Sequence, residues 1–315
     1  YWLALTVLAF ALPLAGIWSG AHPFVYYGFL QLYDPATVGG GISQGWTLSV
    51  EVSFYVAVPL IAAAAVRVVP KRRLASQLWV VGGLGAVSVA FNVLVAYGGL
   101  GGLSYAPAAL LSGLPASFFF FAIGMLCAIA GVVLGDRERQ PGIIRLLDRA
   151  PSAAWLVALA AFALVVAITA GDRSGRVSGS HWLAHQLLYA VVGAAFVAPA
   201  VFGDQTRGAL RRLLANRALL FLGVISYGIY LWHLGLMFLL AKWGFGHHGF
   251  GSTYLAWAAS GIAVTVVVAG ASYLLVERPA LGLKRLIAGP RRGTGDRRSP
   301  VPAAPGSERE PVRPG

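Results

Sequence analysis

Residues Ala153 to Ala170 read AAWLVALAAFALVVAITA, a stretch without a single charged side chain. A helix of this length comes close to crossing the roughly 30 Å hydrocarbon core of a bilayer. Because lipid offers no partner for backbone N–H and C=O groups, such a stretch is predicted to be helical. Outward from it lie seven further apolar stretches of similar length, running approximately from Tyr1 to Trp18, Gly45 to Val66, Gln77 to Tyr97, Ala108 to Leu134, Trp182 to Phe202, Leu219 to Ala241 and Thr253 to Val276. The sequence therefore predicts an all-α fold, a polytopic transmembrane helix bundle over residues 1–288.

Composition supports this prediction. The chain has 315 residues, of which 58% are hydrophobic and 11% charged, whereas soluble domains carry about 25% charged residues. A pair of soluble domains is thereby excluded. The net charge of +13 would suit nucleic-acid binding, but 21 of the 24 Lys and Arg residues fall in alternate segments between the apolar stretches or after the last one. This is the pattern of positive cytoplasmic loops. It predicts no nucleic-acid partner and places both ends of this chain in the cytoplasm.

The two ends of the chain have compositions of their own. Residues 289–315 are rich in Pro, Gly and Arg, and are predicted to form a disordered basic cytoplasmic tail. The chain starts at Tyr1 without Met and inside an apolar run, so we expect that its first helices are missing. Glu277-Arg278-Pro279 is expected to end the last helix, because proline cannot continue the hydrogen-bond ladder. Cys127 is the single cysteine, which excludes a disulfide within the chain.

Two ionisable residues inside the apolar stretches are candidates for chemistry, because such groups are costly in a membrane unless they face a cavity or a partner. Glu51 lies roughly 9 Å from the outer end of its helix and His233 roughly 12 Å from the same face. We predict that one outward-opening cavity contains both as catalytic residues. The alternatives are a hydrogen-bonded structural carboxyl for Glu51 and a satisfied core imidazole for His233.

Polar and aromatic side chains surround these two positions and predict a sugar-sized pocket. The alternative is an interfacial aromatic belt with interhelical hydrogen bonds. Asn92 is interpreted as a packing residue. His181 and His185, spaced i, i+4, and the pair His247 and His248 have no cysteine or nearby carboxylate beside them, so no metal site is predicted. The predicted substrate-binding residues are Trp46, Ser49, Tyr55, Tyr227 and Tyr230.

Three segments together resemble the acyltransferase-3 family of multi-pass bacterial membrane acyltransferases. Residues 44–55 read QGWTLSVEVSFY, similar to the family's pattern Trp-Ser-Leu-x-Val-Glu-x-x-Phe-Tyr. Residues 226–233 read SYGIYLWH, similar to its Ser-Tyr-x-x-Tyr-Leu-x-His helix, and residues 276–279 read VERP. The resemblance extends from Tyr1 to about Leu286. Val52 departs from it, because many members have a second glutamate there.

The resemblance implies a bundle of about ten membrane helices that moves an acyl group, often acetyl, from acyl-CoA to a hydroxyl of a cell-surface carbohydrate or glycolipid. The donor acetyl-CoA is a substrate, with no cofactor bound permanently, and the membrane would be the bacterial plasma (inner) membrane. The family's first helix, which carries an arginine and a catalytic histidine, has no counterpart here. Glu51 would orient or charge-balance that base, and His233 with the tyrosines would position the acceptor or stabilise the oxyanion.

Cytoplasmic arginines such as Arg67, Arg72 and Arg73 could contact coenzyme A phosphates, although topology alone explains them. Two other functions remain open from the sequence. One is a transporter or flippase of lipid-linked sugars, which would use the same cavity without an acyl donor. The other is a catalytically inactive fragment.

Overall fold

A computed structural model describes residues 1–12, 17–68, 73–98, 108–133, 142, 150–171, 178–202, 208–244 and 252–287. Every regular element in these ranges is a helix, which confirms the predicted all-α class. The chain divides into two compact units, Tyr1–Gly270 and Ala271–Gly315. The predicted basic tail, residues 289–315, lies outside the described residues.

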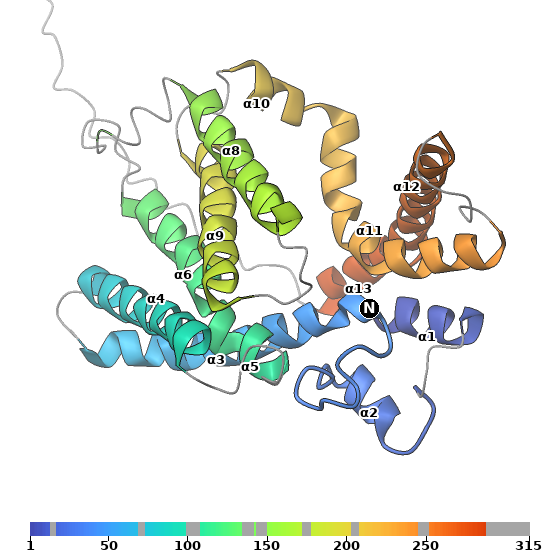
Figure 1. Cartoon of the computed structure of the whole chain (residues 1–315), viewed down its shortest axis with the longest axis horizontal. Helices are drawn as coiled ribbons and strands as arrows, with labels where there is room; N and C mark the ends of the chain where they lie inside the picture. Colours follow the sequence, from blue (N-terminus) through green and yellow to red (C-terminus); the bar gives the residue numbers. More distant parts are fainter. Residues whose placement is uncertain are drawn as a thin grey trace, which may run out of the picture. The chain divides into compact units, whose positions relative to one another are not determined.

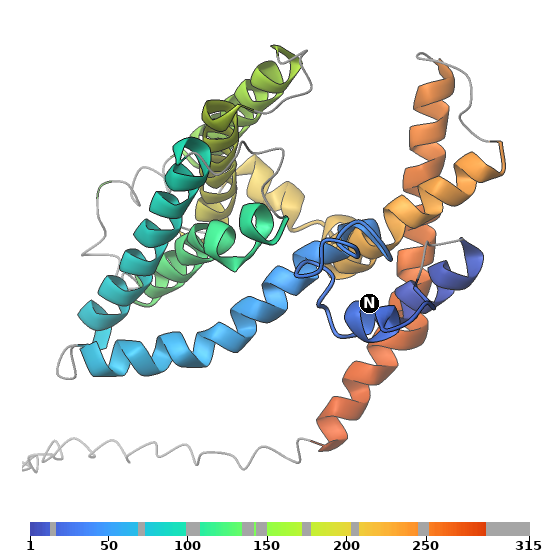
Figure 2. The ribbon, with the colours of Figure 1, turned by 60° about the horizontal axis from the view of Figure 1, so that its bottom comes forward.

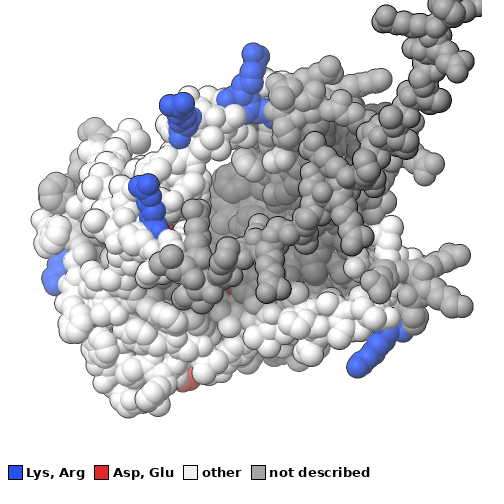
Figure 3. Space-filling model, turned by 180° about the vertical axis from the view of Figure 1, so that it is seen from behind, with Lys and Arg blue, Asp and Glu red and all other residues white. Residues whose placement is uncertain are grey.

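Seven of the described helices are long and apolar enough to cross a membrane, so the chain is a multi-pass membrane protein. Apolar side chains lie on their outside: Leu156 and Leu159 are exposed by 65% and 64%. On the face seen in Figure 3, the residues that the structure describes include few charged side chains. Such a surface suits lipid rather than water. The seven helices, drawn in Figure 1, are α3 (Trp46–Val68), α4 (Arg73–Tyr97), α6 (Leu114–Val133), α8 (Pro151–Gly171), α9 (Gly179–Val201), α11 (Arg217–Lys242) and α12 (Ser252–Ser272).

The first apolar stretch differs from the expected single span over Tyr1–Trp18. The structure has a ten-residue helix, α1 (Trp2–Ala11), that ends in extended backbone at Leu12. Proline at position 13 explains this end, because a residue that precedes proline is driven out of the helical region. A ten-residue helix rises only about 15 Å, half of a bilayer core. The side of the membrane on which Tyr1 lies therefore stays a prediction.

Helix pairs in the first unit pack through small residues and buried amides. Helix α4 contacts α3, α6 and α9, and α8 lies along α9 (Figures 1 and 2). A Cβ atom at Gly85 of α4 would lie only 3.0 Å from the Cβ of Ala122 on α6. Asn92 donates from Nδ2 to the carbonyls of Ser88 at 2.9 Å and Ala116 at 2.8 Å. Asn92 therefore joins α4 to α6, in agreement with its interpretation as a packing residue.

Two short elements precede α3, and the second of them contacts its start. Helix α2 (His22–Tyr27) and the 3-10 helix η1 (Ser43–Gly45) belong to the segment 17–45 that follows α1. Both η1 and α1 contact α11, and η1 also contacts the start of α3. The start of α11 is itself defined by a cap, because Asn216 Oδ1 accepts from the Ala218 amide at 2.9 Å. The site region is thus built from η1, α3 and α11.

In the second unit the expected helix end at Glu277-Arg278-Pro279 is wrong. A π-helical turn, η4 (Tyr273–Glu277), leads into α13 (Arg278–Ile287). Proline at position 279 removes one backbone donor and crowds the carbonyl four residues earlier. The wider turn of a π-helix relieves that crowding, and proline is tolerated in the first turn of the helix that follows.

Candidate functional site

The buried side chain of Gln31, in the segment 17–45 before α3, holds η1 in place. Gln31 is 1% exposed, and its Nε2 donates to the carbonyl of Gly45 at 2.7 Å. Thr37 donates from Oγ1 to the Gln31 carbonyl at 3.3 Å. Nearby, burial raises the pKa of Tyr26, and the Asp34 carboxylate raises it further, so this phenol stays protonated. The segment before α3 is therefore fixed by buried polar contacts, which are costly to leave unpaired.

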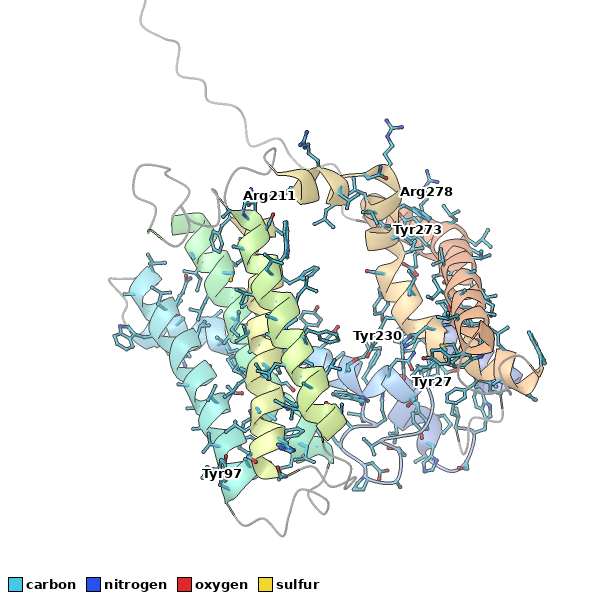
Figure 4. All side chains as sticks on the ribbon, turned by 45° about the horizontal axis from the view of Figure 1, so that its top comes forward. Tyr27, Tyr97, Arg211, Tyr230, Tyr273 and Arg278 are labelled. Carbon is cyan, nitrogen blue, oxygen red and sulfur yellow. The ribbon has the colours of Figure 1, made fainter. Side chains whose placement is uncertain are left out.

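A reciprocal set of hydrogen bonds joins η1 to the middle of α11. Gln44 donates from Nε2 to the carbonyls of Tyr230 at 2.7 Å and Leu231 at 3.0 Å. In return, the hydroxyl of Tyr230, which Figure 4 labels, donates to the Gln44 carbonyl at 3.1 Å. The same hydroxyl lies 2.7 Å from Thr47 Oγ1 in the first turn of α3. We call these four contacts the Gln44–Tyr230 clamp.

The two predicted catalytic residues flank this clamp. His233 is half-buried, with its ring 5.9 Å from that of Tyr230, and its Nδ1 lies 2.7 Å from the Tyr230 carbonyl oxygen. Glu51 is also half-buried and lies one turn beyond Thr47 on the same face of α3. No side chain among the described residues donates a hydrogen bond to Glu51. Its carboxylate is consequently available to a partner, and no hydrogen bond or ion pair joins it to His233 within the described part of the chain.

The predicted substrate-binding residues have different surroundings. Trp46, half-buried, is the first residue of α3, and Tyr230 belongs to the clamp. Ser49 is 1% exposed, and its Oγ has no hydrogen-bond partner among the described residues. Tyr55 and Tyr227 are exposed by 65% and 44%. The structure thus brings Tyr230 beside His233, buries Ser49, and leaves Tyr55 and Tyr227 at the surface.

Gln44 belongs to the motif at residues 44–55, but the sequence alone gives it no role. The signal that singles it out is a glutamine at the edge of an apolar stretch, because a buried amide must find hydrogen-bond partners. Gln44 is 7% exposed, and its Oε1 is buried without a partner among the described residues. Its contacts with α11 span 186 and 187 residues of sequence, and no local pattern predicts them.

A cavity of about 410 Å³ opens between α3, α4 and α6, away from these residues. Its lining is apolar except for Gln77, and it includes none of the predicted site residues. A sugar pocket needs several polar groups, so this cavity does not match the one predicted. The residues that line it include Val58, Ile61, Val81, Met125 and Ile129.

Histidines at the predicted outer ends of the helices have other neighbours. His185 Nε2 lies 3.3 Å from Thr169 Oγ1, which joins α9 to α8, and the backbone amide of His181 donates to the capping Ser178 Oγ at 3.2 Å. Among the residues that the structure describes, no group of three or more His, Cys, Asp or Glu side chains could hold a metal ion. His247 and His248 lie outside the described residues.

The arginines after the apolar helices do not share one role. Arg67 is exposed near the end of α3, whereas the side chains of Arg72 and Arg73 lie outside the described part. Arg211, one of the 21 Lys and Arg residues in the alternate segments, is 5% exposed. Its guanidinium donates to the carbonyls of Pro199 at 3.1 and 2.8 Å and Phe202 at 2.8 Å, at the end of α9. Arg211 therefore caps a helix C-terminus, where a positive charge is favourable.

Comparison with known proteins adds the family. A family model described as an acyltransferase domain matches residues 1–274, most of the 315-residue chain. No curated protein and no solved structure matches the chain. The matched range contains η1, α3 and α11, and so all seven predicted site residues.

Proposed function

The chain belongs to the acyltransferase-3 family, and from this membership we propose that it transfers an acyl group from acyl-CoA to a hydroxyl of a cell-surface carbohydrate or glycolipid. Acetyl is the acyl group to test first. The family match over residues 1–274 is the observation that carries this proposal. Seven long apolar helices support a reaction within a membrane. We assign the protein to the bacterial inner membrane, with the segments rich in Lys and Arg in the cytoplasm.

The proposed reaction is an acyl transfer from a thioester to an alcohol. The acceptor oxygen attacks the thioester carbonyl carbon, a C–O ester bond forms and the C–S bond breaks. Coenzyme A leaves as the thiol, which carries the proton that the hydroxyl has lost. Such a step needs a base for the hydroxyl and hydrogen-bond donors for the oxyanion.

In this proposal Glu51 orients or charge-balances the base that the resemblance assigns to an earlier helix. His233 and the tyrosines position the acceptor. Two observations support these roles. The Gln44–Tyr230 clamp fixes the turn of α11 before His233 against the start of α3, and the half-buried Glu51 carboxylate receives no hydrogen bond from a described side chain.

The substitution Glu51→Gln tests the proposal, because it keeps the shape of the side chain and removes its charge. The full-length protein is purified in detergent and given radiolabelled acetyl-CoA and cell-envelope carbohydrate, and both thiol release and transferred label are measured. We expect a loss of about 100-fold or more. Glu308→Gln, in the basic tail, is the matched control. Unchanged transfer by Glu51→Gln would contradict the role of Glu51.

The same assay separates the enzyme from a transporter of lipid-linked sugars. Detergent abolishes the two compartments that transport needs, but acyl transfer does not depend on them. A transporter would release no coenzyme A thiol above the rate without protein.

A further inference from the structure

The hydrogen bonds of His233 determine which of its ring nitrogens carries the proton. Nδ1 lies 2.7 Å from the carbonyl oxygen of Tyr230 and 3.2 Å from that of Ile229. A carbonyl oxygen only accepts, so Nδ1 must be the donor. A neutral imidazole has one N–H group, and its other nitrogen then carries a lone pair. In the neutral ring Nε2 is consequently a hydrogen-bond acceptor.

The carbonyl that accepts from His233 is held in place by Gln44. The Gln44 amide donates to that oxygen at 2.7 Å and to the next carbonyl, of Leu231, at 3.0 Å. The Tyr230 hydroxyl donates back to the Gln44 carbonyl at 3.1 Å. The turn of α11 that orients the imidazole is therefore tied in both directions to η1, immediately before Trp46 begins α3.

We propose that His233 keeps a proton on Nδ1, that Nε2 of the neutral ring accepts the hydrogen bond of the acceptor hydroxyl, and that Gln44 is the positioning residue for this arrangement. The role in orienting the hydroxyl rests on the proposed function. The position of the proton distinguishes two roles that the sequence does not separate for His233, positioning the acceptor and stabilising the oxyanion. Stabilising the oxyanion through Nε2 would require a proton there in addition to the one on Nδ1, hence a charged ring. The neutral tautomer accepts a hydrogen bond from the substrate and donates none through Nε2.

The tautomer is measured directly by nitrogen NMR on the full chain, labelled with ¹⁵N-histidine, in lipid nanodiscs at neutral pH. The chain has six histidines, and the signals of His233 are those that His233→Gln removes. We expect one protonated nitrogen, Nδ1, and one unprotonated nitrogen, Nε2. A proton on Nε2, in either the other tautomer or an imidazolium, overturns the proposal. Because no catalysis is needed, this result is independent of whether acyl transfer is the function.

The positioning role of Gln44 is tested with Gln44→Met, which keeps the length of the side chain and removes both donated hydrogen bonds. We expect His233 to exchange between tautomers, and kcat with acetyl-CoA to fall roughly tenfold at unchanged KM for acetyl-CoA. Gln77→Met, an exposed glutamine on α4, is the matched control and should leave both measurements unchanged.

A merely structural role of Gln44 would lower the thermal midpoint and leave the His233 tautomer as in the unsubstituted protein. That outcome would overturn Gln44 as the positioning residue. If neither the unsubstituted protein nor the Gln44→Met variant transfers acetyl but the NMR signals behave as expected, the proposed function fails and the tautomer assignment stands.

Discussion

At the scale of single residues, the phenol of Tyr230 joins positions 183 residues apart in the chain, through its contact with Thr47. Tyr230→Phe removes this contact and the bond to the Gln44 carbonyl while it keeps the ring. We expect the free energy of unfolding to fall by about 1–2 kcal/mol. Thermal unfolding in one detergent measures this loss. Tyr97→Phe, at a tyrosine 64% exposed, is the control, and equal midpoints for the two variants would refute the energetic role of the clamp.

The residue scale also shows what the sequence can and cannot predict about the site. The predicted depth of Glu51 and His233 in the membrane rests on their distance from the ends of the apolar stretches. The structure places both residues in helices and half-buries both side chains. The contacts of Gln44 were not predictable, because they depend on which helices become neighbours. The 65% exposure of Tyr55 was not predictable either, because helical spacing shows on which face of a helix a residue lies but not what covers that face.

At the scale of elements, the contact between α1 and α11 depends on a glycine. A Cβ atom at Gly235 would lie 2.6 Å from both δ carbons of Leu8, which is 2% exposed and has little room to move. We expect Gly235→Ala to destabilise the protein by about 1–3 kcal/mol through overpacking. A Cβ atom at Gly223, on the same helix, would have nothing within 4 Å of it, so Gly223→Ala should leave stability unchanged or raise it. Chemical denaturation in mixed micelles compares the two, and the same sign for both would contradict the packing of α1 on α11.

The end of α9 provides a second test at this scale. The Arg211 guanidinium donates to the carbonyls of Pro199 and Phe202 at the C-terminal end of this helix. Arg211→Met removes this charged donor, and we expect a loss of about 2–3 kcal/mol in the free energy of unfolding. The neighbouring Arg212 is exposed, and Arg212→Met should change stability by less than about 0.5 kcal/mol. Comparable losses for the two arginines would show that charge, rather than the cap, matters.

Element boundaries were the least predictable part of the fold. Hydropathy locates apolar stretches, but prolines at 13 and 279 act in opposite ways. The first coincides with the end of α1, whereas the second lies in the first turn of α13, after a π-helical turn. Proline chemistry is the same in both cases. The difference comes from the preceding turn, which either widens to accept the ring or leaves the helix.

At the scale of the whole molecule, the distribution of charge predicts the orientation of the seven long helices. With 21 of 24 Lys and Arg residues in alternate segments, the outer segment, residues 17–45 before α3, should face away from the cytoplasm and the segment between α9 and α11 should face it. The side of the membrane on which each segment lies is measured by labelling single exposed cysteines, after Cys127→Ser has removed the only natural thiol of the chain. Ala36→Cys lies in the outer segment and Arg212→Cys in the short helix α10 (Ala209–Leu214) that precedes α11, and both positions are exposed.

In intact bacterial cells a membrane-impermeant maleimide should label Ala36→Cys and not Arg212→Cys. After the membrane is opened with detergent, both should react, which controls for access to each thiol. The reverse pattern in intact cells would contradict the orientation. It would also move Glu51 from the outer to the inner half of the membrane, because Glu51 lies in the second turn of α3, directly after the outer segment. The clamp and the half-buried carboxylate would then face the cytoplasmic donor, and the acceptor would have to reach them from the cytoplasm.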